Sequence, residues 1–416
     1  MLEKKFCLIG NPLSHSFSKK IHQLFGYSYD LIQLNKTELS DFVKNTTYDG
    51  FNVTIPYKVD IISHLDCLDR SAEDAGSVNT VIKRAGKWVG FNTDIKGLNY
   101  LMDISHITLT NKKILILGSG GTSKTASKLA QIQNAKEILI VSRGGINNYD
   151  NLCNHFDADI IINTTPVGMY PDNKRRLIDL IPFKSLSGLI DVIYNPTMTD
   201  LIMQATKMGI NCSSGLRMLV AQAKFARDLF LDETTDFSLI EKVFAKIATN
   251  TTNLVLIGMP SSGKSLIGKL LASELNRKFV DSDMVIESKM GMTIPQVFER
   301  FGEPYFRSVE SACINEIGKN QGLVIATGGG TPFNSDCYES LKQNGLLVHL
   351  TRPLEKTILT GRPLLKDPAN LKTLYNERYP KYLQLSDITF ANNQHANLTT
   401  KNILRWFNEY YYNKRS

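Results

Sequence analysis

The sequence is poor in cysteine and has no long hydrophobic stretch. Its six cysteines are scattered over 416 residues, without a C-x-x-C pair or the spacing of a zinc site, so we predict reduced thiols in a cytoplasmic protein. No apolar run approaches the roughly 20 residues that a membrane-spanning helix needs. The N-terminal MLEKKFCLIG has charges and a short apolar strand but not the hydrophobic core of a secretory signal. These absences argue against disulfide-rich secreted proteins, zinc-binding modules and membrane-spanning proteins.

A large excess of one charge is also missing. The chain has 48 Lys and Arg residues against 40 Asp and Glu residues, which gives a net charge of +8. Its tight basic clusters, NKRR at 173–176 and Lys414-Arg415, are more typical of solvated surface than of a nucleic-acid contact. A basic balance suits small anionic ligands. We therefore expect small-molecule substrates and neither nucleic acid nor a membrane as partner, while the oligomeric state stays open.

The most specific local motif is GMPSSGKS at residues 258–265, which matches the phosphate-binding loop G-x-x-x-x-G-K-[ST] at every fixed position. An apolar strand is predicted before it at 253–257, and residues 266–275 place apolar side chains at helical spacing after it. In that setting backbone N–H groups and the helix N-terminus face a polyphosphate, Lys264 reaches the β- and γ-phosphates, and Ser265 holds Mg²⁺. The alternative, a chance Gly/Ser turn, is weakened by the flanking strand and helix. The residues of this candidate ATP site are Gly258, Ser261, Ser262, Gly263, Lys264 and Ser265.

A second glycine-rich turn, GSGGT at residues 118–122, lies between a predicted strand at 112–117 and a predicted helix at 123–132. This is the placement of a dinucleotide-binding turn, although G-x-G-G is a weaker motif than the full G-x-G-x-x-G. The next predicted strand, 138–141, ends at Ser142-Arg143. An acidic residue there would hold the ribose 2′-hydroxyl of NAD, whereas an arginine suits the 2′-phosphate of NADP. Arg143 therefore favours NADP(H) as the cofactor.

Some polar residues have ordinary structural interpretations when taken alone. Lys58 follows a strand predicted at 50–55 and would be read as an exposed lysine. Asp94 follows a predicted hairpin, 77–82 with 88–92, and would be read as a helix N-cap. Serines before a helix, as at 16 and 18, are usually caps, but they could also present hydroxyls to an anion.

The first half of the chain, residues 1 to about 248, resembles shikimate dehydrogenase along its whole length. The motifs that carry the resemblance are GNPLSHSFS (10–18), NVTIPYK (52–58), SVNT (77–80), GFNTD (90–94), LGSGGTSKT (117–125), INTTPVGM (162–169), DVIYNP (191–196) and GLRMLVAQA (215–223). The resemblance implies that Lys58 and Asp94 form the catalytic pair. It implies substrate contacts from Ser16, Ser18, Thr54, Asn79, Asp94, Tyr194 and Gln222. It implies cofactor contacts from Gly118, Gly120, Gly121, Thr122, Arg143 and Gly215.

The residue types suit the implied reaction. Reducing a ketone needs a hydride from the nicotinamide and a proton for the developing alkoxide. A lysine beside an aspartate can give that proton and stabilise the negative oxygen without a metal.

The sequence departs from this family at three places. Lys19 stands where the family usually has proline, and Ser142-Arg143-Gly144 replaces its Asn-Arg-Thr. The interval 144–157 is short and lacks a second arginine often found there. The last two departures bear on the strength of the NADP preference rather than on the reaction.

The second half, from 253 to about 410, resembles shikimate kinase. The motifs are GMPSSGKS, DSD (281–283), FRSVE (306–310), TGGG (327–330), GRPLL (361–365) and ERYPKY (377–382). The resemblance implies that Asp283 binds the substrate hydroxyls and orients or deprotonates the nucleophile, and that Arg307 and Arg378 bind its carboxylate with bidentate guanidinium groups. It also implies a pocket lined by Gly328, Gly329 and Gly330, support for Mg²⁺ from Asp281 beside Ser265, and stabilisation of the transferring phosphoryl group by Arg362. The segment EKTILTG before Arg362 is shorter than usual and lacks an additional arginine, which leaves adenine stacking open.

We therefore expect an α/β protein with three domains: a substrate-binding α/β domain at 1–105, a Rossmann-like NADP domain at 106–248 whose last helices pack back on the first, and a nucleoside-monophosphate-kinase-like P-loop domain at 253–416. The resemblance implies a bifunctional enzyme that reduces 3-dehydroshikimate to shikimate with NADPH and then phosphorylates shikimate with MgATP. Two alternatives are weighed against it. A metabolite-binding regulator that keeps both folds should have lost Lys58, Asp94, Lys264 or Asp283, all of which are present. A quinate dehydrogenase or an enzyme using NAD is disfavoured by the adjoining kinase motifs and by Arg143.

Overall fold

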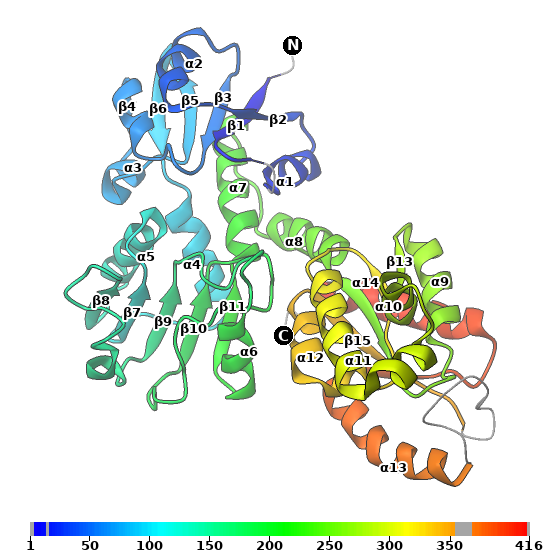
Figure 1. Cartoon of the computed structure of the whole chain (residues 1–416). Coiled ribbons are helices and arrows are strands. Elements are labelled where there is room, and N and C mark those ends of the chain that lie inside the picture. Colours follow the sequence, from blue (N-terminus) through cyan, green and yellow to red (C-terminus); the bar gives the residue numbers. More distant parts are fainter. Residues whose placement is uncertain (1–3, 14–15, 354–367, 414–416) are drawn as a thin grey trace. The chain divides into compact units, whose positions relative to one another are not determined.

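The computed structural model describes residues 4–13, 16–353 and 368–413 (Figure 1). The chain divides into two compact units, Met1–Ile247 and Ala248–Ser416. Each unit is built from its own sheets and its own core.

The first sheet of the first unit has six strands in the order β2-β1-β3-β5-β6-β4. The pairs β1–β2, β1–β3 and β4–β6 are parallel, and the pairs β3–β5 and β5–β6 are antiparallel. The strands are β1 (Phe6–Gly10), β2 (Tyr29–Gln33), β3 (Gly50–Val53), β4 (Cys67–Leu68), β5 (Thr80–Arg84) and β6 (Lys87–Phe91). The helices around them are α1 (Ser18–Leu24), α2 (Leu39–Asn45) and α3 (Arg70–Ala75), with 3₁₀ turns at Lys36–Glu38 and Asp60–His64.

The expected hairpin is present in this sheet. Its two-residue turn has φ of 48° at Ala85 and 80° at Gly86, and positive φ at both central positions matches the right-handed twist of the flanking strands. Before α2, Asn35 caps a 3₁₀ turn in a reciprocal arrangement with Glu38.

The second sheet of this unit has five parallel strands in the order β11-β10-β9-β7-β8. The strands are β7 (Lys113–Leu117), β8 (Glu137–Val141), β9 (Ile160–Asn163), β10 (Gly188–Asp191) and β11 (Asn211–Ser214). The helices are α4 (Asp94–Ile104), α5 (Gly121–Ile132), α6 (Asp200–Lys207), α7 (Leu216–Leu231) and α8 (Ser238–Thr251), with a 3₁₀ turn at Leu152–His155. The side chains of residues 114–117 are fully buried, as expected for a parallel strand covered on both faces. The strand order reverses between β7 and β9, which is where α/β sheets bind ligands at their carboxyl ends.

Helices α4 and α7 pack closely within the first unit. A Cβ on Gly97 of α4 would lie 2.9 Å from the carbonyl oxygen of Met218 and 2.9 Å from Cβ of Gln222. Only glycine permits the two helices to approach so closely. This close packing brings Gln222 beside the start of α4.

The second unit contains a five-stranded parallel sheet with the strand order β13-β14-β12-β15-β16. The strands are β12 (Asn253–Ile257), β13 (Phe279–Asp281), β14 (Val324–Ala326), β15 (Gly345–Thr351) and β16 (Ile388–Ala391). The helices are α9 (Lys264–Leu275), α10 (Ser282–Met290), α11 (Ile294–Gly318), α12 (Ser335–Gln343), α13 (Pro368–Leu385) and α14 (Ala396–Asn413), with a 3₁₀ turn at Thr331–Phe333. The phosphate loop thus connects the central strand β12 to α9.

Helix α13 contains a proline, Pro380. Pro380 does not break its helix, because α13 continues through it to Leu385. The buried Tyr382 and its neighbours Tyr375 and Tyr379 pack this helix against the unit core, which offsets the missing N–H of proline. Helix α8 runs to Thr251 and β12 begins at Asn253, so a single residue separates them.

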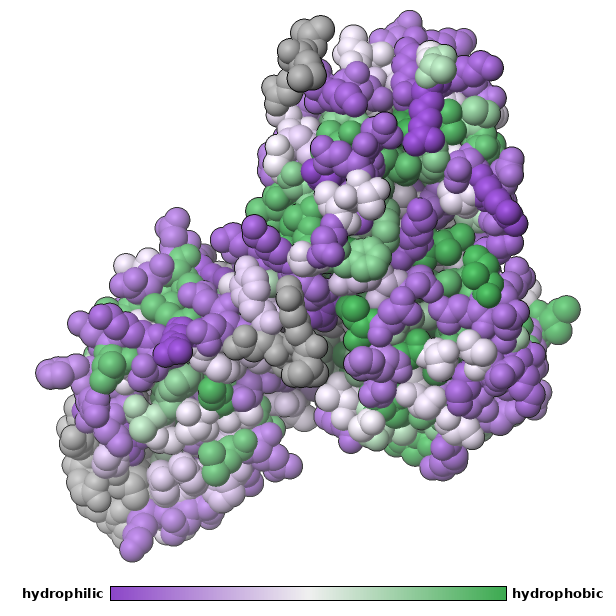
Figure 2. All heavy atoms as spheres, turned by 180° about the vertical axis from the view of Figure 1, so that it is seen from behind, coloured by the Kyte–Doolittle hydropathy of each residue, from purple (hydrophilic) through white to green (hydrophobic). Residues whose placement is uncertain are grey.

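None of the described cysteines forms a disulfide, and their exposure differs between the units. Cys67 and Cys153 of the first unit are exposed, whereas Cys313 and Cys337 of the second are fully buried. Figure 2 shows apolar residues in small separate groups among polar ones on the face that it presents. Within the described ranges, no helix is both long enough and apolar enough to cross a membrane.

Candidate active sites

The first site is centred on an ion pair at the start of α4. Lys58 Nζ lies 2.6 Å from Asp94 Oδ2, and the two side chains are 24% and 12% exposed. Asp94 is the first residue of α4, while Thr93 occupies the N-cap position. The Asp94 carboxylate therefore does not cap the helix, and it pairs with the lysine.

Asn79 holds this ion pair in place from the neighbouring strand end. Its buried side-chain amide donates to Asp94 Oδ1 (2.8 Å), to Thr93 Oγ1 (2.9 Å) and to Gln222 Oε1 (3.4 Å). Asn79 Oδ1 accepts from the backbone N–H of Thr93 at 2.8 Å. The structure thus brings together four of the predicted site residues, namely Lys58, Asn79, Asp94 and Gln222.

Of the other predicted substrate residues, Ser16, Thr54 and Tyr194 lie in loops of the same unit, and Ser18 is the first residue of α1. Ser16 Oγ accepts from the backbone N–H of Ser18 at 3.2 Å. The ring of Phe17, between these serines, lies 5.4 Å from the ring of Tyr194, centroid to centroid. Thr54 follows β3, and its methyl carbon lies 2.4 Å from where a Cβ on Gly10 would be. Glycine at position 10 therefore lets the β3 loop approach the end of β1.

The glycine turn after β7 has the shape of a dinucleotide site. Gly118 has φ of 106°, and its N–H donates to the carbonyl of Val141 at 2.8 Å. A Cβ on Gly120 or Gly121 would meet no described atom within 4 Å, so the space before the N-terminus of α5 is open. Thr122 lies in the first turn of that helix. Such an N-terminus suits the pyrophosphate of NADP.

Arg143 and Gly215 lie at two further strand ends. Arg143 is exposed just after β8, and its charge lowers the pKa of Tyr149, although burial raises that pKa overall. Gly215 is the N-cap residue of α7, and a Cβ there would lie 2.0 Å from the carbonyl oxygen of Val192. Only glycine fits at this approach, so the chain passes close to the strand end that carries Tyr194.

Asp191, which the sequence motif contained but did not single out, organises the Tyr194 loop. This buried carboxyl accepts from Thr199 Oγ1 (2.6 Å), Asn163 Nδ2 (3.0 Å) and the N–H of Ile193 (3.1 Å). Burial raises the pKa of Asp191 to about 6, and these hydrogen bonds oppose the rise.

In the second unit, the phosphate loop has the backbone of an anion cradle. Its φ angles are positive at Gly258 (142°), Ser261 (64°) and Gly263 (95°). Lys264 Nζ donates to the carbonyl oxygens of Gly258 and Met259, both at 2.9 Å. Ser262 Oγ is buried and has no hydrogen-bond partner among the described residues. An unpaired buried hydroxyl and a lysine folded back on its own loop suit a site that receives phosphate oxygens.

A pair of oxygen ligands marks the expected metal position. Ser265 Oγ donates to Asp281 Oδ2 at 2.7 Å. Among the described residues no cluster of three or more His, Cys, Asp and Glu side chains could hold a metal ion by itself. Both observations fit Mg²⁺, which keeps several waters and is bound through one or two protein oxygens together with substrate phosphates.

Each of the three glycines after β14 lies close to a different side chain of the predicted substrate site. A Cβ on Gly328 would lie 2.8 Å from Asp283 Oδ1, and one on Gly329 would lie 3.5 Å from Arg378 Nη1. A Cβ on Gly330 would lie 3.1 Å from both terminal nitrogens of Arg307. The glycines thus leave room for one carboxylate and two guanidinium groups to converge on a single loop.

Glu310 is a member of this site that the FRSVE motif contained without a role. Its buried carboxylate accepts from Arg307 Nη1 at 2.7 Å and from Thr331 Oγ1 at 2.6 Å, and so it ties the arginine to the residue after the glycines. Arg307 also pairs with Glu303 at 3.0 Å. Arg362, the remaining predicted residue, lies outside the described residues.

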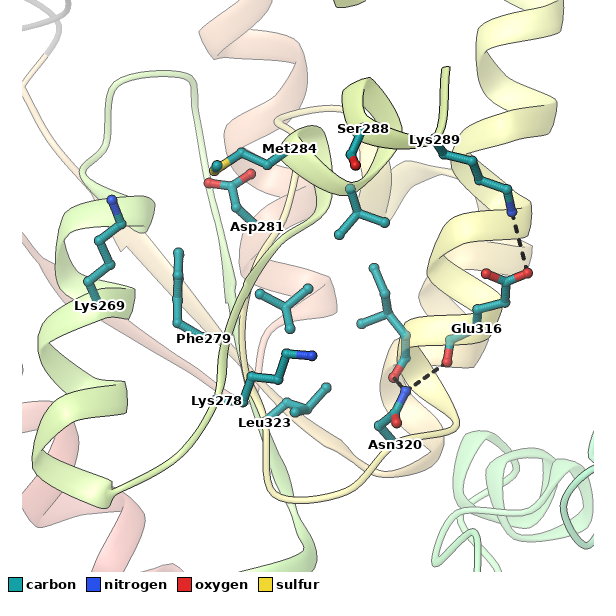
Figure 3. Close-up of a pocket in the computed structure, with 13 residues that line it drawn as sticks. Lys269, Lys278, Phe279, Asp281, Met284, Ser288, Lys289, Glu316, Asn320 and Leu323 are labelled. Carbon is teal, nitrogen blue, oxygen red and sulfur yellow. Dashed lines mark hydrogen bonds and ion pairs between the residues drawn. The ribbon is translucent and has the colours of Figure 1, made fainter. Parts of the chain in front are cut away.

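A cavity of about 650 Å³ lies beside β13 (Figure 3). Its walls come from α9, β13, α10 and α11, and Asp281 belongs to them. Lys289 pairs with Glu316 across one side at 3.4 Å, whereas Lys269 and Lys278 form no hydrogen bond or ion pair with the described residues. This cavity therefore borders the expected metal position at Asp281, and the three glycines do not line it.

Comparisons with known proteins match both halves of the chain. The family model "Shikimate dehydrogenase substrate binding domain" matches residues 8–81, and the model "Shikimate kinase" matches residues 260–408. The shikimate dehydrogenase (NADP(+)) of Shouchella clausii (strain KSM-K16) is 31% identical over 271 residues, which cover 58% of this chain and 98% of that protein.

Solved structures are similar over the same part of the chain. A chorismate mutase/shikimate 5-dehydrogenase fusion protein from Clostridium acetobutylicum has a TM-score of 0.57 and 31% identity, covering 59% of this chain and 97% of that chain. Shikimate 5-dehydrogenase from Thermus thermophilus, in complex with NADP(H) and shikimate, has a TM-score of 0.52 and 25% identity, covering 58% and 99%. The chain therefore belongs to the shikimate dehydrogenase family and carries a shikimate kinase domain after the dehydrogenase, as a bifunctional enzyme of the shikimate pathway.

Proposed function

We propose that this chain catalyses two consecutive reactions: reduction of 3-dehydroshikimate to shikimate, and phosphorylation of shikimate to shikimate 3-phosphate. The observation that carries the proposal is that one polypeptide holds both the Lys58–Asp94 pair and a glycine loop faced by Asp283, Arg307 and Arg378. The hydroxyl oxygen made by the first reaction is the nucleophile of the second. When bound, NADPH supplies the hydride, and MgATP supplies the phosphoryl group.

In the reductase, Lys58 Nζ donates a proton to the ketone oxygen as negative charge develops there. Asp94 holds the ammonium at 2.6 Å and keeps it aimed at the substrate, and Asn79 fixes the carboxylate. Until the proton moves, the ammonium also stabilises by its charge the negative oxygen that develops.

Around this pair, hydroxyl and amide groups bind the substrate. The proposed substrate contacts are Ser16, Ser18, Thr54, Asn79, Tyr194 and Gln222. The proposed cofactor contacts are Gly118, Gly120, Gly121 and Thr122 for the pyrophosphate, Arg143 for the 2′-phosphate, and Gly215.

In the kinase, Asp283 orients the attacking hydroxyl and accepts its proton. Arg307 and Arg378, which we name the carboxylate clamp, hold the substrate carboxylate against the glycine loop, where a guanidinium group makes two parallel hydrogen bonds. Lys264, which donates to two backbone carbonyls, would bind phosphate oxygens in their place, and Ser265 with Asp281 would hold Mg²⁺. Arg362 is proposed to stabilise charge on the transferring group.

The proposed domains are 1–105 for substrate, 106–248 for NADP and 253–416 for the kinase. The two compact units of the structure, which divide after Ile247, support a separate kinase domain. Because of this division, each activity should survive loss of the other.

A coupled assay of the purified full chain tests the proposal. With 3-dehydroshikimate, NADPH and MgATP, we expect oxidation of NADPH, formation of ADP, and appearance of shikimate 3-phosphate by mass spectrometry. Without ATP the products should stop at shikimate. Binding of either metabolite without turnover would contradict the proposal and favour a metabolite-binding regulator.

A further inference from the structure

Tyr382 lies one helical turn after Arg378 on α13 and is fully buried. Its hydroxyl donates a short hydrogen bond to the carbonyl oxygen of Gly329, the middle glycine of the loop. The Arg378 side chain is hydrogen-bonded to the same hydroxyl. The Tyr382 hydroxyl therefore connects Arg378, one of the two residues of the carboxylate clamp, to the glycine loop.

The ring that carries this hydroxyl is held from two sides. It stacks on the His349 imidazole at 5.0 Å between centroids and 24° between planes, and it lies 4.9 Å from the ring of Phe333. The Arg378 guanidinium carbon lies 5.5 Å from the centre of the same Phe333 ring. Since packing fixes the tyrosine ring, the position of its hydroxyl is fixed as well.

The hydroxyl keeps its proton, because burial raises the pKa of Tyr382 well above its usual value even though the nearby Arg378 charge lowers it. It can therefore donate to Gly329 and accept from Arg378 at the same time. A phenylalanine would keep the stacking but leave the buried carbonyl and one guanidinium N–H without their partner.

We propose that Tyr382 is a positioning residue for shikimate binding, which sets Arg378 and the Gly329 loop at a fixed separation through its hydroxyl. This inference rests on the proposed kinase function and on the carboxylate clamp. The physical reason is geometric: a bidentate guanidinium–carboxylate contact needs both partners placed to a fraction of an ångström, and small displacements lower rates strongly. An arginine on a helix does not provide that accuracy alone, because its long side chain has several rotamers.

The test is Tyr382→Phe in the full chain, with reductase activity as an internal check on the protein. We expect kcat/KM for shikimate to fall about tenfold to a hundredfold, the range for a lost hydrogen bond to a charged group. Most of the fall should lie in the KM for shikimate, with the KM for ATP within about twofold of wild type.

The matched control is Tyr338→Phe. Tyr338 packs against the same core cluster as Tyr382, and its hydroxyl makes no hydrogen bond to the residues that the structure describes. This variant should keep kcat/KM for shikimate within about twofold. An equal loss in both variants would mean that the kinase tolerates no tyrosine-to-phenylalanine change in this core, and it would overturn the inference.

A second measurement separates positioning from simple packing. Shikimate methyl ester presents no carboxylate to the clamp, so wild type should use it poorly and Tyr382→Phe should lose no further activity on it. An equal additional loss on the ester and the acid would overturn the positioning role. If wild type used the ester as well as the acid, the carboxylate clamp would itself be wrong. If wild type phosphorylated neither, the proposed kinase function would fail.

Discussion

In the dehydrogenase site the Lys58 ammonium already touches a partner carboxylate at 2.6 Å, whereas in the kinase site the Lys264 ammonium is bonded to two carbonyl oxygens of its own loop at 2.9 Å each. The first lysine is paired with the carboxylate that we propose to act with it in the reaction. The partners of the second must be given up when phosphate oxygens arrive. The two units therefore illustrate two ways to keep a buried or half-buried cation satisfied before a substrate binds.

The groups that surround the two lysines also differ between the sites. Asn79 fixes the dehydrogenase pair through side-chain hydrogen bonds. In the kinase, backbone groups with positive φ form the phosphate cradle, and glycines leave space for Asp283 and the two arginines. We therefore expect the side-chain network to recognise one small substrate, and the backbone cradle to bind polyphosphates with selectivity supplied by the carboxylate clamp.

The largest effect should come from the preformed pair. Lys58→Ala removes both the proton donor and the charge beside the developing alkoxide, so we expect reduction to slow by about 10²–10⁴-fold. Phosphorylation by the same protein should stay near normal. Steady-state NADPH oxidation with 3-dehydroshikimate measures the first activity, and ADP release with shikimate measures the second. A loss of only a few-fold in reduction would show that this pair is not the proton donor.

Lys264→Ala should give the opposite pattern. The loss of one positioned cation at the phosphates should lower phosphorylation by about 10²–10³-fold, and reduction should be unchanged. In the coupled assay NADPH would be consumed and shikimate would accumulate. Formation of shikimate 3-phosphate at more than about a tenth of the wild-type rate would be incompatible with the role given to this lysine.

Acid should destabilise both units through one histidine in each. Burial lowers the pKa of His22 to about 3, and burial together with the Lys264 charge lowers that of His349 to about 4. In the unfolded chain a histidine titrates near 6.5, so between that pH and the folded value the unfolded state binds the extra proton. The stabilisation is complete above about pH 6.5 and is lost as the pH falls toward 4.

At pH 5 we expect each histidine to lower the free energy of unfolding of its unit by about 2 kcal/mol relative to pH 7. Urea unfolding of His349→Asn should show a smaller pH dependence in the second unit only, and His22→Asn in the first only. An unchanged pH dependence in both variants would assign the acid sensitivity to other groups.

The smallest effect concerns cofactor choice. Arg143 is the one arginine at the end of β8, so we expect a modest preference for NADPH, within about tenfold in kcat/KM over NADH. Arg143→Ala should shrink that ratio toward one without changing phosphorylation. A wild-type ratio at or below one would contradict the role of this residue.

The sequence predicts the local elements well where a motif fixes both the spacing and the chemistry. The strands and helices around the two glycine turns lie within a few residues of their expected places, because apolar periodicity and glycine mark them. The family resemblance brings Lys58 and Asp94 into one site, although neither residue alone indicated it.

What the sequence did not predict depends on contacts between distant segments. Glu310 reads as one charge on a helix, and only the fold shows that it is buried against Arg307 and Thr331. Tyr382 reads as a core aromatic, and its bond to Gly329 spans more than fifty positions along the chain. Pro380 reads as a helix stop, yet packing overrides its local preference.

The exposure of their cysteines gives the two units different reactivity toward thiol reagents. Because Cys67 and Cys153 are exposed and Cys313 and Cys337 are buried, an alkylating reagent applied to the native chain should label the first unit rapidly and leave the two buried thiols of the second protected. Those two thiols become reactive only when the kinase unit opens. Timed alkylation followed by peptide mass spectrometry would therefore measure the rate at which the kinase unit opens in the intact protein.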